Sequence, residues 1–179
     1  SKFSKGKGIS KNDIKTNGEY LCIRYGELYT HYSEVINNII SRTDRNPDFY
    51  VLSEENDIII PSSGEDRFGI ATASCVLVKN VILGGDLNIL KTKVNGIFLA
   101  YYLNSSKKRE IANLAQGVSV VHLYSSQLRG LKVSLPDKQE QQKIANFLTA
   151  VDKRIELVQQ QVTQWQAYKK GMMQQLFSQ

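Results

Sequence analysis

The last part of the chain has the hydrophobic pattern of a long helix. Pro136 ends the segment before it, because proline lacks a backbone N–H and biases the preceding residue away from helical geometry. Asp137 and Glu140 then have the spacing of a capping box, which satisfies the first free N–H groups of a helix. Ile144 and Leu148 follow on one face. The pattern therefore predicts a helix that begins near Asp137.

A second helix start is predicted at Thr149, which precedes Asp152 by three residues and repeats the capping spacing in a weaker form. From there, apolar residues recur at alternating steps of four and three, which is typical of a coiled coil. A helix from Thr149 to Phe177 would be roughly 43 Å long at about 1.5 Å per residue. Lys169 fills one gap in the apolar stripe, which consists of Val151, Ile155, Val158, Val162, Trp165, Met172 and Leu176.

Glutamines occupy much of the rest of this predicted helix, and they solvate it without selecting a partner by charge. The apolar stripe can pack either against the helix's own domain or against a second helix. A single domain rarely has a flat core long enough to cover such a stripe, so we expect a second helix as the partner.

Short apolar runs separated by polar turns fill most of the chain before residue 95. Many short strands at close spacing indicate a curved mixed sheet or a barrel-like sheet. We expect the turn after one run at residues 61–64 and a glycine turn at residues 84–86. The predicted strands lie at residues 19–25, 58–60, 70–78, 81–83 and 87–90, with a shorter β-branched segment at residues 35–41.

The pattern changes after residue 95, where apolar residues have helical spacing. One or two helices are predicted over residues 95–113, with a break near residues 104–106, and a helical turn is predicted at residues 126–129. Residues 131–135 alternate apolar and polar positions like a strand. The fold class is therefore an α/β (α+β) domain with a curved mixed sheet over residues 1–136. A helical region follows over residues 137–179, as a short helix and then a long coiled-coil helix.

Composition narrows the class of protein only slightly. The chain has 179 residues and a formal net charge of +6, and a modest positive excess favours a nucleic-acid partner without excluding others. No apolar run is long enough to span a membrane, and no signal-peptide pattern opens the chain. Cys22 and Cys75 have no metal-ligand spacing, so they indicate buried thiols in a reducing compartment. We expect a cytoplasmic protein.

The first residues contain a glycine-rich segment between lysines. Gly6 and Gly8 allow the backbone to approach another group closely, and Lys5 and Lys7 lie beside them. A loop that contacts phosphate and a solvated turn both fit this segment. Lys11 opens a predicted helical turn directly afterwards.

Two C-terminal segments resemble a known family. Residues 135–155 contain Leu-Pro, then Glu-Gln-Gln-Lys-Ile-Ala-Asn-Phe-Leu, then Asp152 and Ile155, and residues 169–177 read Lys-Lys-Gly-Met-Met-Gln-Gln-Leu-Phe. Both resemble the conserved region of specificity subunits of Type I restriction–modification enzymes. Residues 6–10, 24–30, 61–64, 84–88 and 115–123 resemble the target recognition domain of the same family.

The resemblance implies sequence-specific recognition of double-stranded DNA for restriction and DNA methylation. The domain would read one half of a split target, and the helix would pair antiparallel with a second helix, supplied in cis or by a homodimer. Methyltransferase subunits that use S-adenosylmethionine would dock on this assembly, and a nuclease/translocase subunit that uses ATP and Mg would join them. No cofactor is expected in this chain.

One departure from the family pattern leaves two alternatives open. Family subunits usually carry two recognition domains, two helical regions and a lead-in strand before the Gly6–Ser10 segment, whereas this sequence has one copy and almost no lead-in. We expect either a fragment of a full subunit or a half-length subunit that must dimerise.

Sequence motifs for catalysis are missing from the chain. The three prolines, Pro47, Pro61 and Pro136, are isolated, so the Asp/Asn-Pro-Pro-aromatic loop of an adenine methyltransferase is lacking. No Walker-type loop occurs, and neither Pro47-Asp48 nor Pro136-Asp137 is followed by the Glu-x-Lys of a metal-dependent nuclease. We therefore expect a non-catalytic subunit.

Candidate DNA contacts are polar residues that lie on predicted loops in or beside the family-like segments. Of these, Gln116 and Ser119, beside Gly117, are favoured most, and a structural role stays open for each candidate. A protein-interaction module with a long oligomerising helix and no DNA specificity is the alternative function. The full candidate set is Lys5, Lys7, Lys11, Arg24, Tyr25, Ser62, Ser63, Arg67, Gln116, Ser119, His122 and Tyr124.

Overall fold

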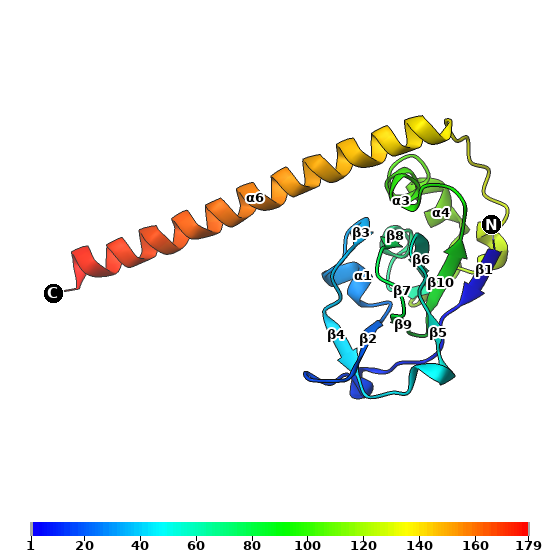
Figure 1. Cartoon of the computed structure of the whole chain (residues 1–179), viewed down its shortest axis with the longest axis horizontal. Helices are drawn as coiled ribbons and strands as arrows, with labels where there is room; N and C mark the ends of the chain where they lie inside the picture. Colours follow the sequence, from blue (N-terminus) through cyan, green and yellow to red (C-terminus); the bar gives the residue numbers. More distant parts are fainter. Residues whose placement is uncertain (1, 179) are drawn as a thin grey trace. The chain divides into compact units, whose positions relative to one another are not determined.

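A computed structural model of the chain describes residues 2–178 and divides into two compact units. The first unit comprises Ser1–Gln142 and contains all the strands, and the second unit comprises Lys143–Gln179 and is helical (Figure 1). The division falls inside the last helix, α6 (Lys138–Phe177), so the first turn of α6 belongs to the first unit.

The largest sheet has five strands and is mixed, as the sequence predicts. Each strand pairs antiparallel with its neighbour, except for the parallel pair between the last two strands in the order. Ile59 lies opposite Ile89 in the middle of this sheet. The order across the sheet is β1 (Lys2–Lys5), β10 (Leu87–Lys91), β6 (Asp57–Pro61), β8 (Ser74–Val76) and β3 (Val35–Ile36).

Two smaller sheets complete the β structure of the described residues. The four-stranded sheet has the order β4 (Ser41–Thr43), β2 (Tyr20–Ile23), β9 (Ile82–Leu83) and β5 (Val51–Leu52), and its β2–β9 pair is parallel. The two-stranded sheet pairs β7 (Ser63–Gly64) with β11 (Val121–His122). The sheets are open, so the curved mixed sheet is confirmed in preference to a barrel.

Short helices connect these strands. The two helices predicted after residue 95 are confirmed as α3 (Gly96–Asn104) and α4 (Lys108–Leu114). The helical turns predicted at Lys11 and at residues 126–129 are confirmed as well. The remaining short helices are η1 (Lys11–Asp13), α1 (Glu27–Thr30), η2 (Pro47–Phe49), α2 (Arg67–Ile70) and α5 (Ser125–Leu128).

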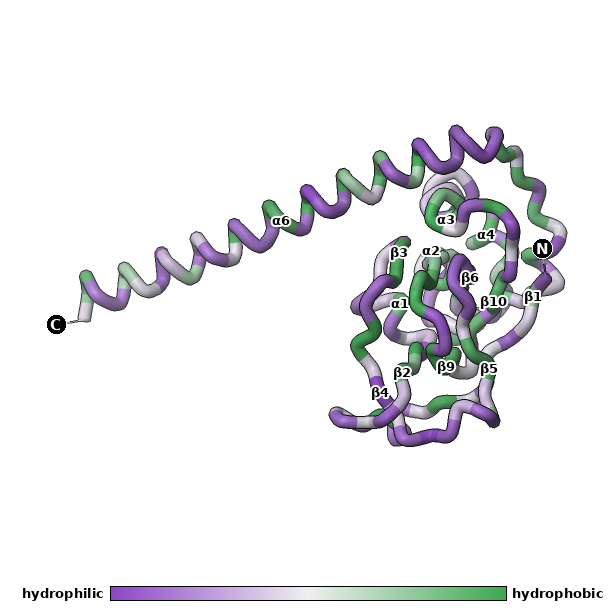
Figure 2. Tube along the Cα trace, viewed as in Figure 1, coloured by the Kyte–Doolittle hydropathy of each residue, from purple (hydrophilic) through white to green (hydrophobic). Residues whose placement is uncertain are grey.

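The predicted buried strand at residues 58–60 is the centre of the core. Successive side chains of a strand point to opposite faces, and here both faces are covered. Ile58 and Ile60 join an apolar cluster with α3, α4 and α5, whereas Ile59 joins a cluster with Ile23 and Leu83 of the four-stranded sheet. Every residue of β6 is buried, which explains the unbroken apolar run. Figure 2 shows hydrophobic segments concentrated in these inner strands.

The prediction of one strand over residues 70–78 is only partly correct. Ile70 ends α2, and the strand β8 covers Ser74–Val76 alone. The apolar run is continuous because both elements are buried, so its hydrophobicity does not show where the helix ends.

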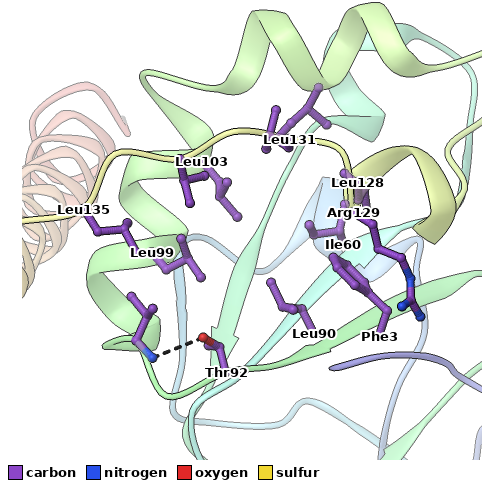
Figure 3. A pocket seen from close by; sticks show the side chains of 13 residues that line it. Phe3, Ile60, Leu90, Thr92, Leu99, Leu103, Leu128, Arg129, Leu131 and Leu135 are labelled. Atoms are coloured by element: carbon purple, nitrogen blue, oxygen red, sulfur yellow. Dashed lines mark hydrogen bonds between the residues drawn. The ribbon is translucent and has the colours of Figure 1, made fainter. Parts of the chain in front are cut away.

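The strand predicted at residues 131–135 is absent from the structure. This segment follows α5 without pairing to any strand, and it crosses an apolar cavity of about 210 Å³. Leu131 and Leu135 line the cavity from this segment, and Phe3, Leu90 and Leu99 line it from the sheet and α3 (Figure 3). The alternation of apolar residues therefore reflects contact with the core rather than a sheet ladder.

The helix α6 runs without interruption through the predicted second start. Asp137 caps it, since its carboxylate accepts a hydrogen bond from the N–H of Glu140 at 2.9 Å, as predicted. The expected break at Thr149 is wrong, because a threonine is compatible with a helix interior and no proline or glycine intervenes. The resulting single helix of 40 residues is about 60 Å long at about 1.5 Å per residue.

The predicted coiled-coil stripe lies on the part of α6 that forms the second unit. Val151, Ile155, Val158 and Val162 are exposed, and Trp165 is exposed to a greater extent. Figure 2 shows this helix as alternating hydrophobic and hydrophilic bands. Pairing with a second helix stays a prediction. Among residues 2–178, no helix is long and apolar enough to cross a membrane.

Candidate nucleic-acid interface

Five segments that are distant in sequence are joined by hydrogen bonds, most of them between backbone groups, and we call them the loop surface: residues 5–8, 24–29, 62–68, 84–88 and 116–124. Gly6 donates to Leu87 O at 2.9 Å, and Gly84 donates to Ile23 O at the same distance. Ser62 donates to Asp86 O at 2.8 Å, and Leu123 donates to Ser62 O at 3.1 Å. The fold therefore brings together all five segments that resemble the recognition domain of the family.

The glycines at the start of the chain have different roles in this surface. A Cβ on Gly6 would lie 1.9 Å from the carbonyl oxygen of Gly84, so the close approach inferred from the sequence is to another turn of the same protein. A Cβ on Gly8 would meet nothing within 4 Å. Lys5 and Lys7 are exposed on either side of Gly6, and Lys5 Nζ lies 4.0 Å from Asp86 Oδ1.

Arg24 is held by a buried carboxylate. Its Nε donates to Glu27 Oε1 at 3.0 Å, and its Nη2 lies 2.9 Å from the same oxygen. The Ser41 hydroxyl also donates to Glu27 Oε1, at 2.6 Å. Because a buried carboxylate needs such partners, Arg24 has a structural function here whether or not it also contacts DNA.

The β7–β11 pair places two of the predicted residues together. Ser63 Oγ and His122 Nδ1 are 3.2 Å apart, and the His122 ring stacks on Tyr124 at a centroid distance of 6.2 Å. The Ser62 side chain is buried, and its hydroxyl has no hydrogen-bond partner among residues 2–178. The orientation of Ser62 differs from the expected DNA-facing one because residues on either side of it alternate faces along the extended chain.

Tyr29 belongs to the same surface, although the sequence did not single it out. Its hydroxyl donates to Ser63 O at 2.8 Å, and its ring meets Tyr25 edge to face at 6.3 Å. The ring remains partly exposed, but burial of the hydroxyl end raises the pKa of Tyr29. The hydroxyl therefore stays protonated and connects α1 to β7 at neutral pH.

A short hairpin carries the favoured residues Gln116 and Ser119. The backbones of Gln116 and His122 exchange two hydrogen bonds, at 2.9 and 2.7 Å, which close the hairpin at its base. Gly117 has a φ of 123°, and a Cβ there would lie 2.0 Å from Val120 O. Only glycine fits this position, so the turn of the hairpin is fixed by sequence.

The helix α2 borders the hairpin and supplies a further cation. Asp66 caps this helix by accepting from the N–H groups of Phe68 and Gly69, each at 2.8 Å. Arg67 and Phe68 are both exposed at its start. Lys11 differs from the other predicted residues, because its element η1 is connected to β4 rather than to the loop surface. The Thr43 hydroxyl of β4 donates to Asp13 O at 2.7 Å, and Arg45, just after β4, donates to the Asp13 carboxylate.

The loop surface thus combines exposed cations, aromatic rings and hydrogen-bonding side chains, which suits phosphate contacts and base contacts together. No group of three or more possible metal-ligating His, Cys, Asp or Glu side chains occurs within residues 2–178. Sequence reasoning missed four exposed members of the surface: Tyr29, Phe68, Val118 and Val120. The sequence could have indicated Val118 and Val120, because both are apolar and lie within three residues of the loop-forming Gly117.

Comparison with known sequences matches most of the chain to one family. The family model described as Type I restriction modification DNA specificity domain matches residues 1–164. The Type I restriction enzyme MjaVIII specificity subunit of Methanocaldococcus jannaschii is 27% identical over 130 residues, which are 72% of this chain and 29% of that protein. This chain therefore spans less than a third of the length of that relative.

Solved structures have the same fold at low sequence identity. The S subunit of a Type I restriction-modification system from M. genitalium matches 99% of this chain and 43% of its own, with a TM-score of 0.64 and 23% identity. The HsdS subunit from Thermoanaerobacter tengcongensis matches 89% of this chain and 37% of its own, with a TM-score of 0.58 and 12% identity. The sequence-based prediction of the fold is confirmed by these similarities.

Proposed function

Because this chain belongs to the family of Type I restriction modification DNA specificity domains, we propose that it recognises a specific DNA sequence as one half of a bipartite target. In this proposal the chain is a non-catalytic subunit, and the loop surface is the part that contacts the duplex. Methyltransferase subunits that bind S-adenosylmethionine carry out DNA methylation in the same cytoplasmic complex. A nuclease/translocase subunit supplies the chemistry that requires ATP and Mg.

The observation that carries the proposal is the convergence of the five family-like segments on one surface. Their positions span residues 5 to 124, yet each segment is hydrogen-bonded to at least one of the others. These connected segments carry the exposed Lys7, Arg67, Gln116 and Tyr124, which core packing does not require. A DNA-reading site requires such an arrangement, because phosphates fix the register and base edges give the specificity.

The cations and the hairpin have separate functions on this surface. Lys5, Lys7 and Arg67 contact phosphates, so affinity falls as salt rises, with a slope of about −0.9 per phosphate neutralised on a log–log plot. Gln116 reads a base edge, since glutamine can form a bidentate pair with adenine in the major groove, and such a pair discriminates by about 1–3 kcal/mol.

The helix α6 sets the position of this reader relative to a second one. Its apolar stripe, from Val151 to Leu176, packs against an antiparallel helix supplied in cis or by a second copy of the chain. Exposure of most of the stripe supports this arrangement: Val151, Ile155, Val158, Val162, Trp165 and Leu176 are exposed. The alternative of an interaction module without DNA specificity is not favoured, because the family match covers the compact domain as well as the helix.

The experiment is binding of the assembled complex to its methylation motif, which methylome sequencing of the host identifies. We expect Gln116→Ala to lose about 1–3 kcal/mol of affinity for the motif and to relax one base position. Lys7→Ala should instead weaken binding to every sequence and reduce the salt slope by about 1.

Lys93→Ala is the matched control, because Lys93 is exposed on the connection between β10 and α3, outside the loop surface. It should leave both the motif affinity and the salt slope as they are. The proposed position of the DNA is wrong if Gln116→Ala and Lys7→Ala both behave like this control.

A further inference from the structure

The tip of the hairpin formed by residues 116–122 points to a particular kind of base contact. We propose that Val118, with Val120 beside it, reads the C5-methyl group of a thymine in the major groove. This inference rests on the proposed DNA-recognition function and adds one specificity-determining residue and its chemistry to it.

Exposure distinguishes Val118 from the other apolar residues of the compact unit, and Val120 beside it is also exposed. Val118 is 96% exposed and Val120 is 52% exposed, whereas the adjacent Val121 is 2% exposed. Val121 pairs with Gly64 in the two-stranded sheet and thereby anchors the hairpin on β7. An apolar side chain that is almost fully solvated in the free protein gains most when a partner covers it.

The backbone presents these valines in a fixed geometry. The paired Gln116 and His122 close the hairpin, and the positive φ of Gly117 turns the chain directly before Val118. On its other side, Leu123 donates to Ser62 and accepts a hydrogen bond from Asn88 Nδ2 at 2.8 Å. The base of the hairpin is therefore tied to the central sheet, so little ordering is required of it when DNA binds.

Charge argues against a phosphate-binding role for the tip. Residues 116–121 contain no charged side chain, and Arg67 on the adjacent α2 is accompanied by Glu65 and Asp66. Lys5 and Lys7 belong to a different segment of the loop surface. The tip thus presents methyl groups between polar side chains, with the phosphate-binding cations placed elsewhere.

Thymine is the base that matches this chemistry. In the major groove, thymine alone among the four bases presents a methyl group, and apolar side chains recognise it by direct contact. Gln116 and Ser119 lie next to the valines and can hydrogen-bond to the edges of neighbouring bases. The hairpin can therefore read an A·T pair by its methyl group and an adjacent pair by hydrogen bonds.

The test uses the assembled complex and duplexes that carry its methylation motif. Each thymine of the motif is replaced in turn by deoxyuridine, which removes only the methyl group. For the wild type we expect one position at which affinity falls about four-fold, the ratio that corresponds to about 0.8 kcal/mol for a buried methyl-sized group. With Val118→Ala, the thymine-to-uracil ratio at that position should fall to about 1, while the ratios at other positions stay unchanged.

Ile40→Ala is the control, because Ile40 is 48% exposed but lies between β3 and β4, outside the loop surface. The inference is overturned if no thymine matters, if the motif has no A·T pair, or if Val118→Ala leaves the ratio intact. It is also overturned if Val118→Ala impairs docking of the methyltransferase subunit instead, which would assign the valines to a protein interface. Failure of the wild-type complex to prefer its motif would instead contradict the proposed function itself.

Discussion

The two units of the molecule place their apolar residues differently. In the first unit, Ile59, Leu83 and Leu87 are completely buried between two sheets. In the second unit, Val158, Val162 and the other members of the stripe except the half-buried Met172 are exposed. Both units have recognisable hydrophobic patterns, with an unbroken apolar run in β6 and apolar residues at steps of three and four in α6. Such a pattern therefore predicts the type of element, and only the surrounding structure determines whether its apolar face is covered.

This difference shows how the two units obtain stability. The first unit buries its own apolar area and has the cores expected of an independently folded domain. Residues 143–178 of the second unit belong to none of the core clusters of the described residues. Most of the stability of a long helix in a protein comes from packing of its apolar face. Its stripe must then be stabilised from outside, which agrees with the proposed pairing of helices.

The largest expected effect comes from charge in the stripe. The double substitution Val158→Glu and Val162→Glu should weaken self-association of the chain by about 3–6 kcal/mol, since each valine contributes about 1.5–3 kcal/mol when buried. Analytical ultracentrifugation over a range of concentrations measures this change.

Gln160→Glu with Gln164→Glu adds the same charge outside the stripe, so it serves as the control and should leave the association constant nearly unchanged. Equal association constants for the two double variants would show that the apolar stripe does not form the interface between the associating chains.

The next largest effect is expected in the core of the first unit. Ile59→Ala should reduce the free energy of unfolding by about 2–5 kcal/mol, because it removes a fully buried side chain between two sheets and leaves a cavity. Urea denaturation, followed by a signal from the first unit, measures this free energy of unfolding. Val162→Ala, in the second unit, should change the free energy of unfolding of the first unit by no more than about 0.5 kcal/mol. A loss as large as that of Ile59→Ala would show that the stability of the first unit depends on the second.

A smaller effect is expected at the buried carboxylate under the loop surface. Glu27→Gln keeps the shape but removes the ion pair with Arg24, and we expect a loss of about 1–3 kcal/mol in the free energy of unfolding. Thermal denaturation measures it. Ser41→Ala, which removes only one donor to the same carboxylate, should cost less, and the reverse order would mean that the ion pair contributes little.

The smallest effect is expected at Asp13, on the exposed turn η1. Hydrogen bonds from the Ser10 hydroxyl and N–H, together with Arg45, lower the pKa of Asp13 from 3.8 to about 2. A carboxyl whose pKa is lower in the folded state stabilises the protein above about pH 4, and this contribution disappears as pH falls through about 2.

Thermal unfolding between pH 2 and pH 7 checks this prediction. The melting temperature of Asp13→Asn should fall below that of the wild type at pH 7, and the difference should narrow toward pH 2. Ser10→Ala should give a weaker form of the same dependence, since it removes one of the bonds. A difference that does not change with pH would rule out the role of the carboxylate charge.

Local chemistry accounts for the parts of the fold that were predicted correctly. The three isoleucines of β6 and the cap at Asp137 were found because hydrophobic runs and capping spacings act over a few residues. The pairing of β1 with β10 was not found, since it joins Phe3 to Leu90 and has no local signature. The segment at residues 131–135 has the alternation of a strand but pairs with nothing, and an alternating pattern cannot distinguish these cases.

The candidate site was predictable in its segments and less so in its individual side chains. The five segments were identified, and the structure joins them. Ser62 was selected for polarity, but the fold turns its side chain inward, and Arg24 is held by Glu27. Conversely, Val118 was passed over because only polar and aromatic residues were selected as candidates. Side-chain direction in a loop depends on the backbone path, which in the hairpin is set by one positive φ at Gly117.

The closure of the hairpin at its base has a consequence for engineering new specificities. Gln116 and His122 bond to each other, and Leu123 bonds to Ser62 and Asn88. We therefore expect that the exposed residues between Gln116 and His122 can be exchanged without disturbing the rest of the domain. Variants that keep Gln116, Gly117 and His122 but randomise residues 118–120 would form a small library in which the proposed DNA-contacting side chains differ. Selection for binding to different DNA sequences would then identify variants with altered target specificity that still fold and express.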